Sequence, residues 1–417
     1  MIKLSRKDKL TGYSRSQLSN AFSARGKLEN LSAYLIQEDD VVDFMITGGV
    51  NDDERFMPLF SVLYWAASKM PVVILHSNDL YIETMAEQAW QSVGGDTYKG
   101  PLWRNSPSNR FFEPFYGMNE RQIIKTVRAL AGKLGYTVTP RFERVANAHL
   151  SILRLLDIPY SLTGLYYLCQ FLDIGEFHDN VLALPCEEEQ CRRIWADIDA
   201  DDESRSGQFD LFRTIINSFA HEAEYCGWDS ENNVHECNAI KAVEKGGVYS
   251  LVVNDMYSTL IQAYLAEELK ICSQSPFFLI IDSLSLHDKE LLAFLCTNNS
   301  KCRLGILSEN AVAEIGESEK DFLKLAESLD CIVILKHSAS SSATVLAELI
   351  GKQDYTKSES AEGYNRGFFR LVPKDKHTDI RYSVENRYKV MPEEITGLKS
   401  SQAIVFDMLS DSTIYYN

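Results

Sequence analysis

The sequence predicts an α/β protein, a mostly parallel sheet flanked by helices, with an all-helical domain inserted into it. In two separate blocks, residues 41–118 and 246–417, short apolar runs alternate with segments of helical periodicity. Such alternation with short turns is typical of parallel sheets covered by helices. Between the blocks, residues 119–245 repeat apolar residues every three or four positions and hold no β-rich run longer than VLALP. This middle segment is therefore expected to be all-α.

Length and composition bound the class of protein. A chain of 417 residues exceeds one simple domain, and 45% hydrophobic residues are ordinary for a folded protein. No run approaches the roughly 18 apolar residues of a membrane span, and MIKLSRKDKLTG lacks the apolar core of a secretory signal. Nine unpatterned cysteines favour a reducing compartment. We expect a cytoplasmic protein without a membrane span of its own, which partners would hold at the inner face of a membrane.

Charge is unevenly distributed. A net charge of −17 argues against a general affinity for nucleic acid. Residues 1–40 form a polar lead-in whose first 30 residues hold seven basic side chains against Asp8 and Glu29. These are Lys3, Arg6, Lys7, Lys9, Arg15, Arg25 and Lys27. A solvated terminus is the simpler interpretation, and contact with DNA, a membrane surface or an acidic partner is the alternative.

An acidic stretch at residues 187–203 has two interpretations. Its carboxylates predict a solvated loop or, less simply, an ion site. The stretch lacks the central glycine and the twelfth-position glutamate of a calcium-binding loop. We therefore predict a solvated loop and no metal ligand.

The first block opens with an apolar strand at residues 41–47 that runs into a Gly-Gly turn. The elements expected after it are a helix at 55–69, a strand at 71–76, a helix at 81–93 and an ordered loop at 96–118. A strand, a tight glycine turn and a helix form the opening βαβ unit of a nucleoside-triphosphate-binding fold, in which the turn reads G-x-x-x-x-G-K-[ST].

This turn lacks the residues that grip phosphate. Laid from Gly48 and Gly49, its last three positions are Asp53, Glu54 and Arg55. The second glycine, the lysine and the magnesium-binding hydroxyl are missing, and carboxylates repel a triphosphate by about 4 kcal/mol per pair of unit charges at 4 Å and an effective dielectric of 20. The pattern therefore predicts an ATPase-like scaffold whose site is inactive in ATP hydrolysis.

The second block, residues 246–417, is predicted to alternate strands and helices to its end. Strands are expected at 248–255, 276–283, 303–308, 331–338 and 402–408, and helices at 256–271, 287–299, 319–329 and 342–352. A polar, mobile loop is expected at 354–366, and MPEEITGL predicts a short capped helix before a hairpin-like end.

The order of these motifs resembles the type IV coupling proteins, the TraG/TraD-like hexameric ATPases of conjugation and type IV secretion. PFFLIIDSLS resembles their Walker B strand, and MPEEITGLKSSQAIVF their closing motif. LDCIVILKHSASSSATVLAELIGKQ resembles a late strand and helix, and FEPFYGMNE the segment after the second strand. The resemblance covers about residues 40–417 and implies a RecA-like, P-loop-type fold.

The departures from that family concern the nucleotide site. The Walker B acid is kept at Asp282, but Ser283 stands where the family has a catalytic glutamate. Ser308 or Glu309 stands where the resemblance implies a glutamine that senses the γ-phosphate. The degenerate nucleotide-site positions are therefore Gly48, Gly49, Asp53, Glu54, Arg55, Asp282, Ser283, Ser308 and Glu309. No residue is predicted to be catalytic.

Three hypotheses about function follow. The first is a pseudo-ATPase without a cofactor, an adaptor or accessory subunit of a conjugative or type IV secretion system. Its partners would be an active coupling-type ATPase, other secretion components, a second copy of itself, and relaxase or effector bound through residues 119–245. The second is a DNA-translocating ATPase with an atypical loop, using ATP and magnesium. The third is a standalone interaction or defence protein on the same scaffold.

Overall fold

The computed structural model describes most of the chain. The described residues are 31–37, 40–49, 52–56, 58–77, 80–93, 102–105, 112–171, 174–198, 203–230, 237–253, 259–282, 288–297, 301–364, 376–400 and 402–416. The basic lead-in at residues 1–30 and Ser283 lie outside them. Within these ranges, no helix is both long and apolar enough to cross a membrane.

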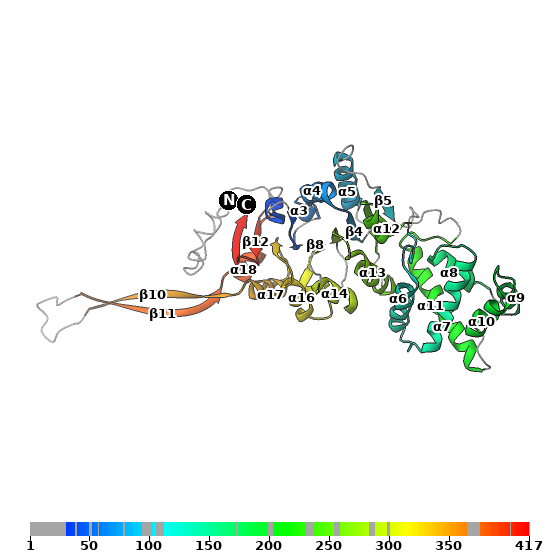
Figure 1. The fold of residues 1–417 in the computed structure, drawn as a ribbon. Helices are drawn as coiled ribbons and strands as arrows, with labels where there is room; N and C mark the ends of the chain where they lie inside the picture. Colours follow the sequence, from blue (N-terminus) through cyan, green and yellow to red (C-terminus); the bar gives the residue numbers. More distant parts are fainter. Residues whose placement is uncertain are drawn as a thin grey trace, which may run out of the picture.

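A nine-stranded sheet forms the body of the molecule (Figure 1). Its order is β13 (Ser412–Tyr416), β12 (Ala403–Asp407), β9 (Cys331–Ile334), β3 (Phe44–Thr47), β8 (Cys302–Ser308), β7 (Phe277–Asp282), β4 (Val72–His76), β6 (Val248–Val252) and β5 (Leu102–Asn105). All pairs from β9 to β5 are parallel, whereas β12 and β13 are antiparallel. The predicted mostly parallel sheet with a terminal hairpin is confirmed.

Helices cover both faces of the sheet because its strands are apolar on both sides. Val72 and Ile74 of β4 belong to one core, and Val73 and Leu75 to the other. The first core lies under α2 (Ser32–Leu35), α4 (Leu59–Lys69) and α5 (Leu80–Val93) (Figure 1). The second lies under α13 (Thr259–Cys272), α14 (Lys289–Cys296), α15 (Ala311–Glu314), α16 (Glu319–Ala326) and α17 (Ser340–Ile350).

The strand connections diverge beside β3. The chain leaves β3 toward β4 on one side, and leaves the neighbouring β8 toward β9 on the other. In open α/β sheets ligands bind at such a switch point, outside the carboxyl ends of the strands. The Gly-Gly turn after β3 lies at that point.

Most of the described residues between β5 and β6 form helices. They are α6 (Glu120–Lys133), α7 (Pro140–Leu155), α8 (Leu162–Cys169), α9 (Ile174–Leu182), α10 (Glu188–Ile198), α11 (Glu203–Glu224) and α12 (Ala239–Glu244). Figure 1 shows them gathered at one end of the sheet. The Phe219 ring of α11 packs against Tyr264 of α13 (ring centroids 5.2 Å apart), and this contact ties the helices to the layer that covers the sheet. The predicted boundaries of an inserted domain stay a prediction.

The expected loop at 354–366 is corrected by the structure. Residues Lys352–Tyr364 form β10, which pairs along its whole length with β11 (Lys376–Tyr388). Figure 1 shows this hairpin extending away from the sheet. The sequence of β10 does not alternate apolar and polar residues, so it carried no period of two to identify a strand.

Three further elements differ from expectation. The expected helix at 55–69 is divided into α3 (Asp52–Phe56) and α4, because Pro58 has no N–H to continue the helix. Helix α10 occupies most of the expected acidic loop, with ion pairs from Glu188 to Arg192 and from Glu189 to Arg193. The short edge strand β5 lies within the expected loop at 96–118.

An acidic cluster lies at the amino ends of β3, β8 and β9. The Asp43 carboxylate accepts a hydrogen bond from the Leu304 N–H (2.8 Å), and the Asp43 N–H donates to the Asp330 carboxylate (3.0 Å). Burial, with the nearby charges of Asp330 and Asp40, raises the pKa of Asp43 from 3.8 to about 6. Arg303 forms an ion pair with Asp40 beside it.

Candidate functional site: the turn after β3

The glycine turn is bonded to both strands that flank β3. The Gly48 N–H donates to the Ser308 carbonyl at the end of β8 (3.0 Å), and the Gly49 N–H donates to the Lys336 carbonyl beyond β9 (2.9 Å). Both residues have positive φ, +92° at Gly48 and +110° at Gly49, a region that glycine adopts without strain. The turn is therefore anchored by the sheet.

Arg55 is folded back into this turn. Its guanidinium donates a hydrogen bond from Nη1 to the Gly48 carbonyl (3.2 Å), and only 3% of the residue is exposed. The neighbouring Glu54 is also buried. The cation at the predicted phosphate position is thus directed, in part, at a carbonyl of its own loop.

His337 fills the space on the other side of Gly48. A Cβ placed on Gly48 would lie 2.9 Å from His337 Cδ2 and Nε2 and 2.9 Å from the Leu335 carbonyl oxygen. His337 Nε2 lies 3.4 Å from Thr47 Oγ1. Burial lowers the pKa of His337 to about 4, so the imidazole is neutral at pH 7 and offers no positive charge to a phosphate.

Polar side chains line the carboxyl edge of the neighbouring strands. Thr47 of β3 is in register with Ser308 of β8, and Asp282 of β7 is in register with Leu307. Thr47 and Ser308 therefore lie side by side on one face of the sheet, whereas Asp282 is paired with the preceding residue of β8 and faces the opposite side. All three are buried.

The Ser308 hydroxyl is hydrogen-bonded to a residue of the segment that follows β8. It donates to the Glu314 carboxylate, which also accepts the Asn310 N–H (3.1 Å). Asn310 Oδ1 in turn accepts the hydroxyl of Ser342 on α17 (2.8 Å). The side chain at the predicted γ-phosphate sensor position is therefore held in an internal network.

The structure gathers most of the predicted positions at one edge. Gly48, Gly49, Glu54, Arg55, Asp282 and Ser308 lie at or next to the carboxyl ends of β3, β7 and β8. Glu309 is exposed, Asp53 belongs to α3 with its side chain outside the described residues, and Ser283 is not described. Sequence reasoning missed His337, which lies near the carboxyl end of the expected strand at 331–338, whereas the observed strand β9 ends at Ile334.

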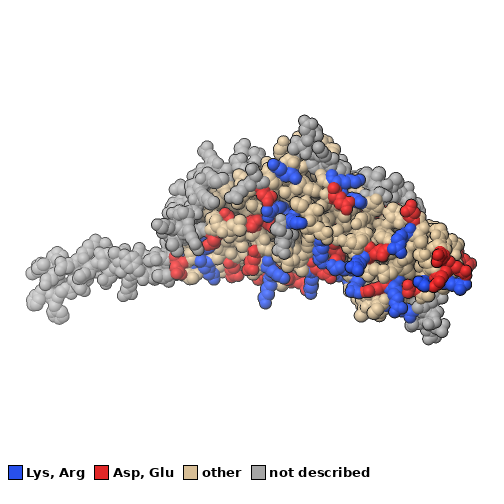
Figure 2. All heavy atoms as spheres, in the orientation of Figure 1, with Lys and Arg blue, Asp and Glu red and all other residues tan. Residues whose placement is uncertain are grey.

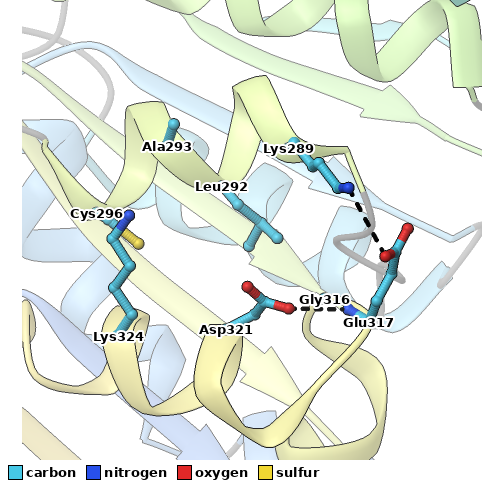
Figure 3. Close-up of a pocket in the computed structure, with 8 residues that line it drawn as sticks. All are labelled: Lys289, Leu292, Ala293, Cys296, Gly316, Glu317, Asp321 and Lys324. Atoms are coloured by element: carbon cyan, nitrogen blue, oxygen red, sulfur yellow. Dashed lines mark hydrogen bonds and ion pairs between the residues drawn. The ribbon is translucent and has the colours of Figure 1, made fainter.

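No metal centre is found in the described part of the chain, where no three His, Cys, Asp or Glu side chains are grouped to hold an ion. A pocket of about 240 Å³ lies between α14 and α16 (Figure 3). Leu292, Ala293 and Cys296 line its apolar wall, while Lys289 and Glu317 pair at its rim (3.8 Å). None of its lining residues belongs to the predicted nucleotide positions.

The fold and this site together define a P-loop NTPase-like α/β protein with an altered phosphate turn. The unbound bacterial conjugative coupling protein TrwBdeltaN70 has a similar structure, with a TM-score of 0.55 and 13% identity over 91% of this chain and 88% of that chain. The structure of TrwB in complex with the ATP analogue ADPNP has a TM-score of 0.53 and 13% identity, over 95% of this chain and 90% of that chain. VirB4 of Thermoanaerobacter pseudethanolicus has a TM-score of 0.50 and 10% identity, over 89% of this chain and 88% of that chain.

These similarities confirm the predicted type IV coupling protein-like, RecA-like fold. No protein-family model matches the sequence, and no curated protein matches it either.

Proposed function

We propose that this protein is a non-catalytic, coupling-protein-like adaptor or accessory subunit of a conjugative DNA-transfer or type IV secretion system. The observation that carries the proposal is the hydrogen bond from Arg55 to the Gly48 carbonyl, in a turn without the phosphate-binding lysine and the hydroxyl. The similarity in fold to a conjugative coupling protein and to VirB4 supports the choice of system.

Phosphoryl transfer depends on positioned positive charge: a loop lysine, a bound Mg²⁺ and often an arginine finger. Here the turn offers Arg55 beside Glu54, together with the neutral imidazole of His337. Asp53 adds a further negative charge to the same turn. The arrangement therefore opposes the binding of a triphosphate, and we assign the protein no nucleotide cofactor.

Hydrolysis would meet a second obstacle. A γ-phosphate sensor must be free to contact the nucleotide, whereas the Ser308 hydroxyl donates to Glu314. Ser283 replaces the acid that would orient water. These two differences are independent of the turn, so repair of the turn alone would not restore catalysis.

The proposed partners are those of a subunit kept for its shape. The α/β body would contact an active coupling-type ATPase or a second copy, and the helical segment 119–245 would recognise relaxase or effector. On the face drawn in Figure 2, basic and acidic side chains are interspersed and do not form one basic surface. That distribution favours protein partners over DNA. The protein would be cytoplasmic and reach the membrane through those partners.

The test is capture of the tagged full-length chain from its native host. Recovery of an active coupling-type ATPase or other secretion components is expected, together with no phosphate release by the purified protein in the presence of DNA and Mg-ATP. Recovery of neither kind of component would contradict the proposal and favour a standalone interaction or defence protein.

A second candidate, an ATPase with an atypical loop, is favoured by two observations. Arg55 is a cation within the turn, and Asp282 ends strand β7, two strands from β3 in the sheet, as a magnesium-binding acid would. This candidate predicts nucleotide-dependent hexamers and DNA-stimulated phosphate release, both lost in Arg55→Ala. Wild-type protein that shows neither activity rules it out.

A further inference from the structure

Two cysteine thiols meet at the start of helix α10. The Sγ atoms of Cys186 and Cys191 lie 2.9 Å apart. A disulfide bond has an S–S distance of about 2.05 Å, so the two sulfur atoms need to move less than about 1 Å to become bonded. This pair is separate from the turn after β3 and from the proposed function.

Local backbone structure fixes the pair in place. Cys186 lies in the turn after α9, where its N–H donates to the Leu184 carbonyl (2.8 Å). Cys191 lies in the first turn of α10, where its N–H donates to the Glu187 carbonyl (3.1 Å). The close approach of the sulfur atoms therefore follows from the turn that starts the helix.

The two thiols differ in access to solvent. Cys186 is partly exposed, while Cys191 is 1% exposed. Of the remaining seven cysteines, six are buried and only Cys296 is partly exposed. An oxidant in solution can reach Cys186, and the thiol nearest to the resulting product is Cys191.

We propose that Cys186 and Cys191 are a redox-sensitive pair that peroxide converts into a disulfide clip across the start of α10. The Cys186 thiolate attacks one peroxide oxygen and gives a sulfenic acid, with loss of hydroxide, which takes up the thiol proton as water. The Cys191 sulfur then displaces the sulfenic hydroxyl, forming the S–S bond and releasing the second water. Two thiols lose two electrons and two protons, and hydrogen peroxide is reduced to two waters.

The groups around Cys186 slow its oxidation by peroxide. The hydrogen bond with Cys191, together with desolvation and the Glu187 carboxylate, raises the pKa of Cys186. Because the thiolate is the reacting form, oxidation at neutral pH is slower than at a specialised low-pKa thiol. The pair therefore responds to sustained exposure to oxidant.

The clip would restrain one end of the helical segment. It joins the turn at residues 183–187 to α10, which carries the exposed Glu188–Arg192 and Glu189–Arg193 pairs. Reduction by a dithiol would restore both thiols, so the change is reversible.

The experiment exposes reduced full-length protein to hydrogen peroxide at pH 8.5 and counts thiols after denaturation. Two of the nine thiols should be lost and then recovered with dithiothreitol. Cleavage after Glu187, Glu188 or Glu189 separates the two cysteines, so the disulfide should hold two peptides together in non-reducing mass spectrometry. Cys186→Ser should abolish the joined peptides, whereas the matched variant Cys169→Ser, at a buried cysteine, should keep them.

Two results would overturn the inference. One is wild-type protein that gives no joined peptides at peroxide doses that oxidise Cys296. The other is a disulfide that maps to any other pair of cysteines. Circular dichroism of Cys186→Ser, expected to match wild type, shows that its lost disulfide does not reflect misfolding.

Discussion

Gly48→Ala tests whether the turn after β3 is closed by the protein itself. The added Cβ would lie 2.9 Å from the His337 ring and from the Leu335 carbonyl oxygen. A residue with a side chain at φ +92° costs about 1–2 kcal/mol, and extra volume in a filled space costs typically about 1–3 kcal/mol. We expect the free energy of unfolding to fall by about 2–5 kcal/mol.

A double-mutant cycle measured by urea unfolding gives the contribution of His337. His337→Ala removes one of the two neighbours of the new methyl group, so the double mutant should be more stable than the sum of the single losses by about 1 kcal/mol. Gly132→Ala is the matched control, because nothing lies within 4 Å of a Cβ there and its φ is ordinary. Unfolding of Gly48→Ala at the wild-type urea concentration, or a cycle without coupling, would show that His337 does not fill the space beside Gly48.

Two further predictions concern Asp43, in the acidic cluster at the amino ends of the strands, and Tyr167, on helix α8. The pKa of Asp43 in the folded protein, about 6, exceeds its ordinary value of 3.8, so the stability that its protonated form contributes is complete below pH 3.8 and lost as pH rises through 6. The free energy of unfolding of Asp43→Asn, measured with urea, should therefore rise relative to that of wild type between pH 4 and pH 8, by at most about 3 kcal/mol. A difference between variant and wild type that is the same at both pH values contradicts this. Tyr167 is 60% exposed on α8, and Tyr167→Ser should reduce partner capture without changing stability by more than about 0.5 kcal/mol. Tyr136→Ser, at a site 43% exposed, should leave capture unchanged; equal capture by both variants counts against recognition through Tyr167.

The apolar strands of the sheet were the most predictable part of the chain. Strands β4 and β7 are continuous apolar runs, and the structure places them within one or two residues of the expected ends. Their order in the sheet was not predictable, because pairing across a sheet depends on contacts far apart in sequence. The position of β3 between β9 and β8 sets the switch point that locates the site.

Elements whose pattern is polar were missed for a physical reason. Helix α10 buries only a narrow apolar face, including Cys191 and Ile194, and its many carboxylates suggested a loop. Strand β10 lacks apolar alternation altogether. Strand β10 is held by its backbone ladder with β11, a long-range pairing that composition does not display.

The candidate site was only partly readable from the sequence. The altered turn could be recognised because the P-loop pattern fixes both residue type and spacing, and the acid at Asp282 ends an apolar strand. The contact of His337 with Gly48 joins segments that are far apart in the sequence; Thr47 and His337, for example, are separated by 290 residues. No local pattern reports such a contact, and the same holds for the Ser308–Glu314 hydrogen bond, whose residue types are common in any turn.

Calorimetric titration of the full chain with ATP and Mg²⁺ measures whether this turn binds nucleotide. We predict no heat of binding up to about 1 mM ligand, which corresponds to a binding free energy weaker than about −4.1 kcal/mol. Micromolar binding that is lost in Arg55→Ala would contradict this prediction, because the guanidinium would then contact phosphate and not the Gly48 carbonyl.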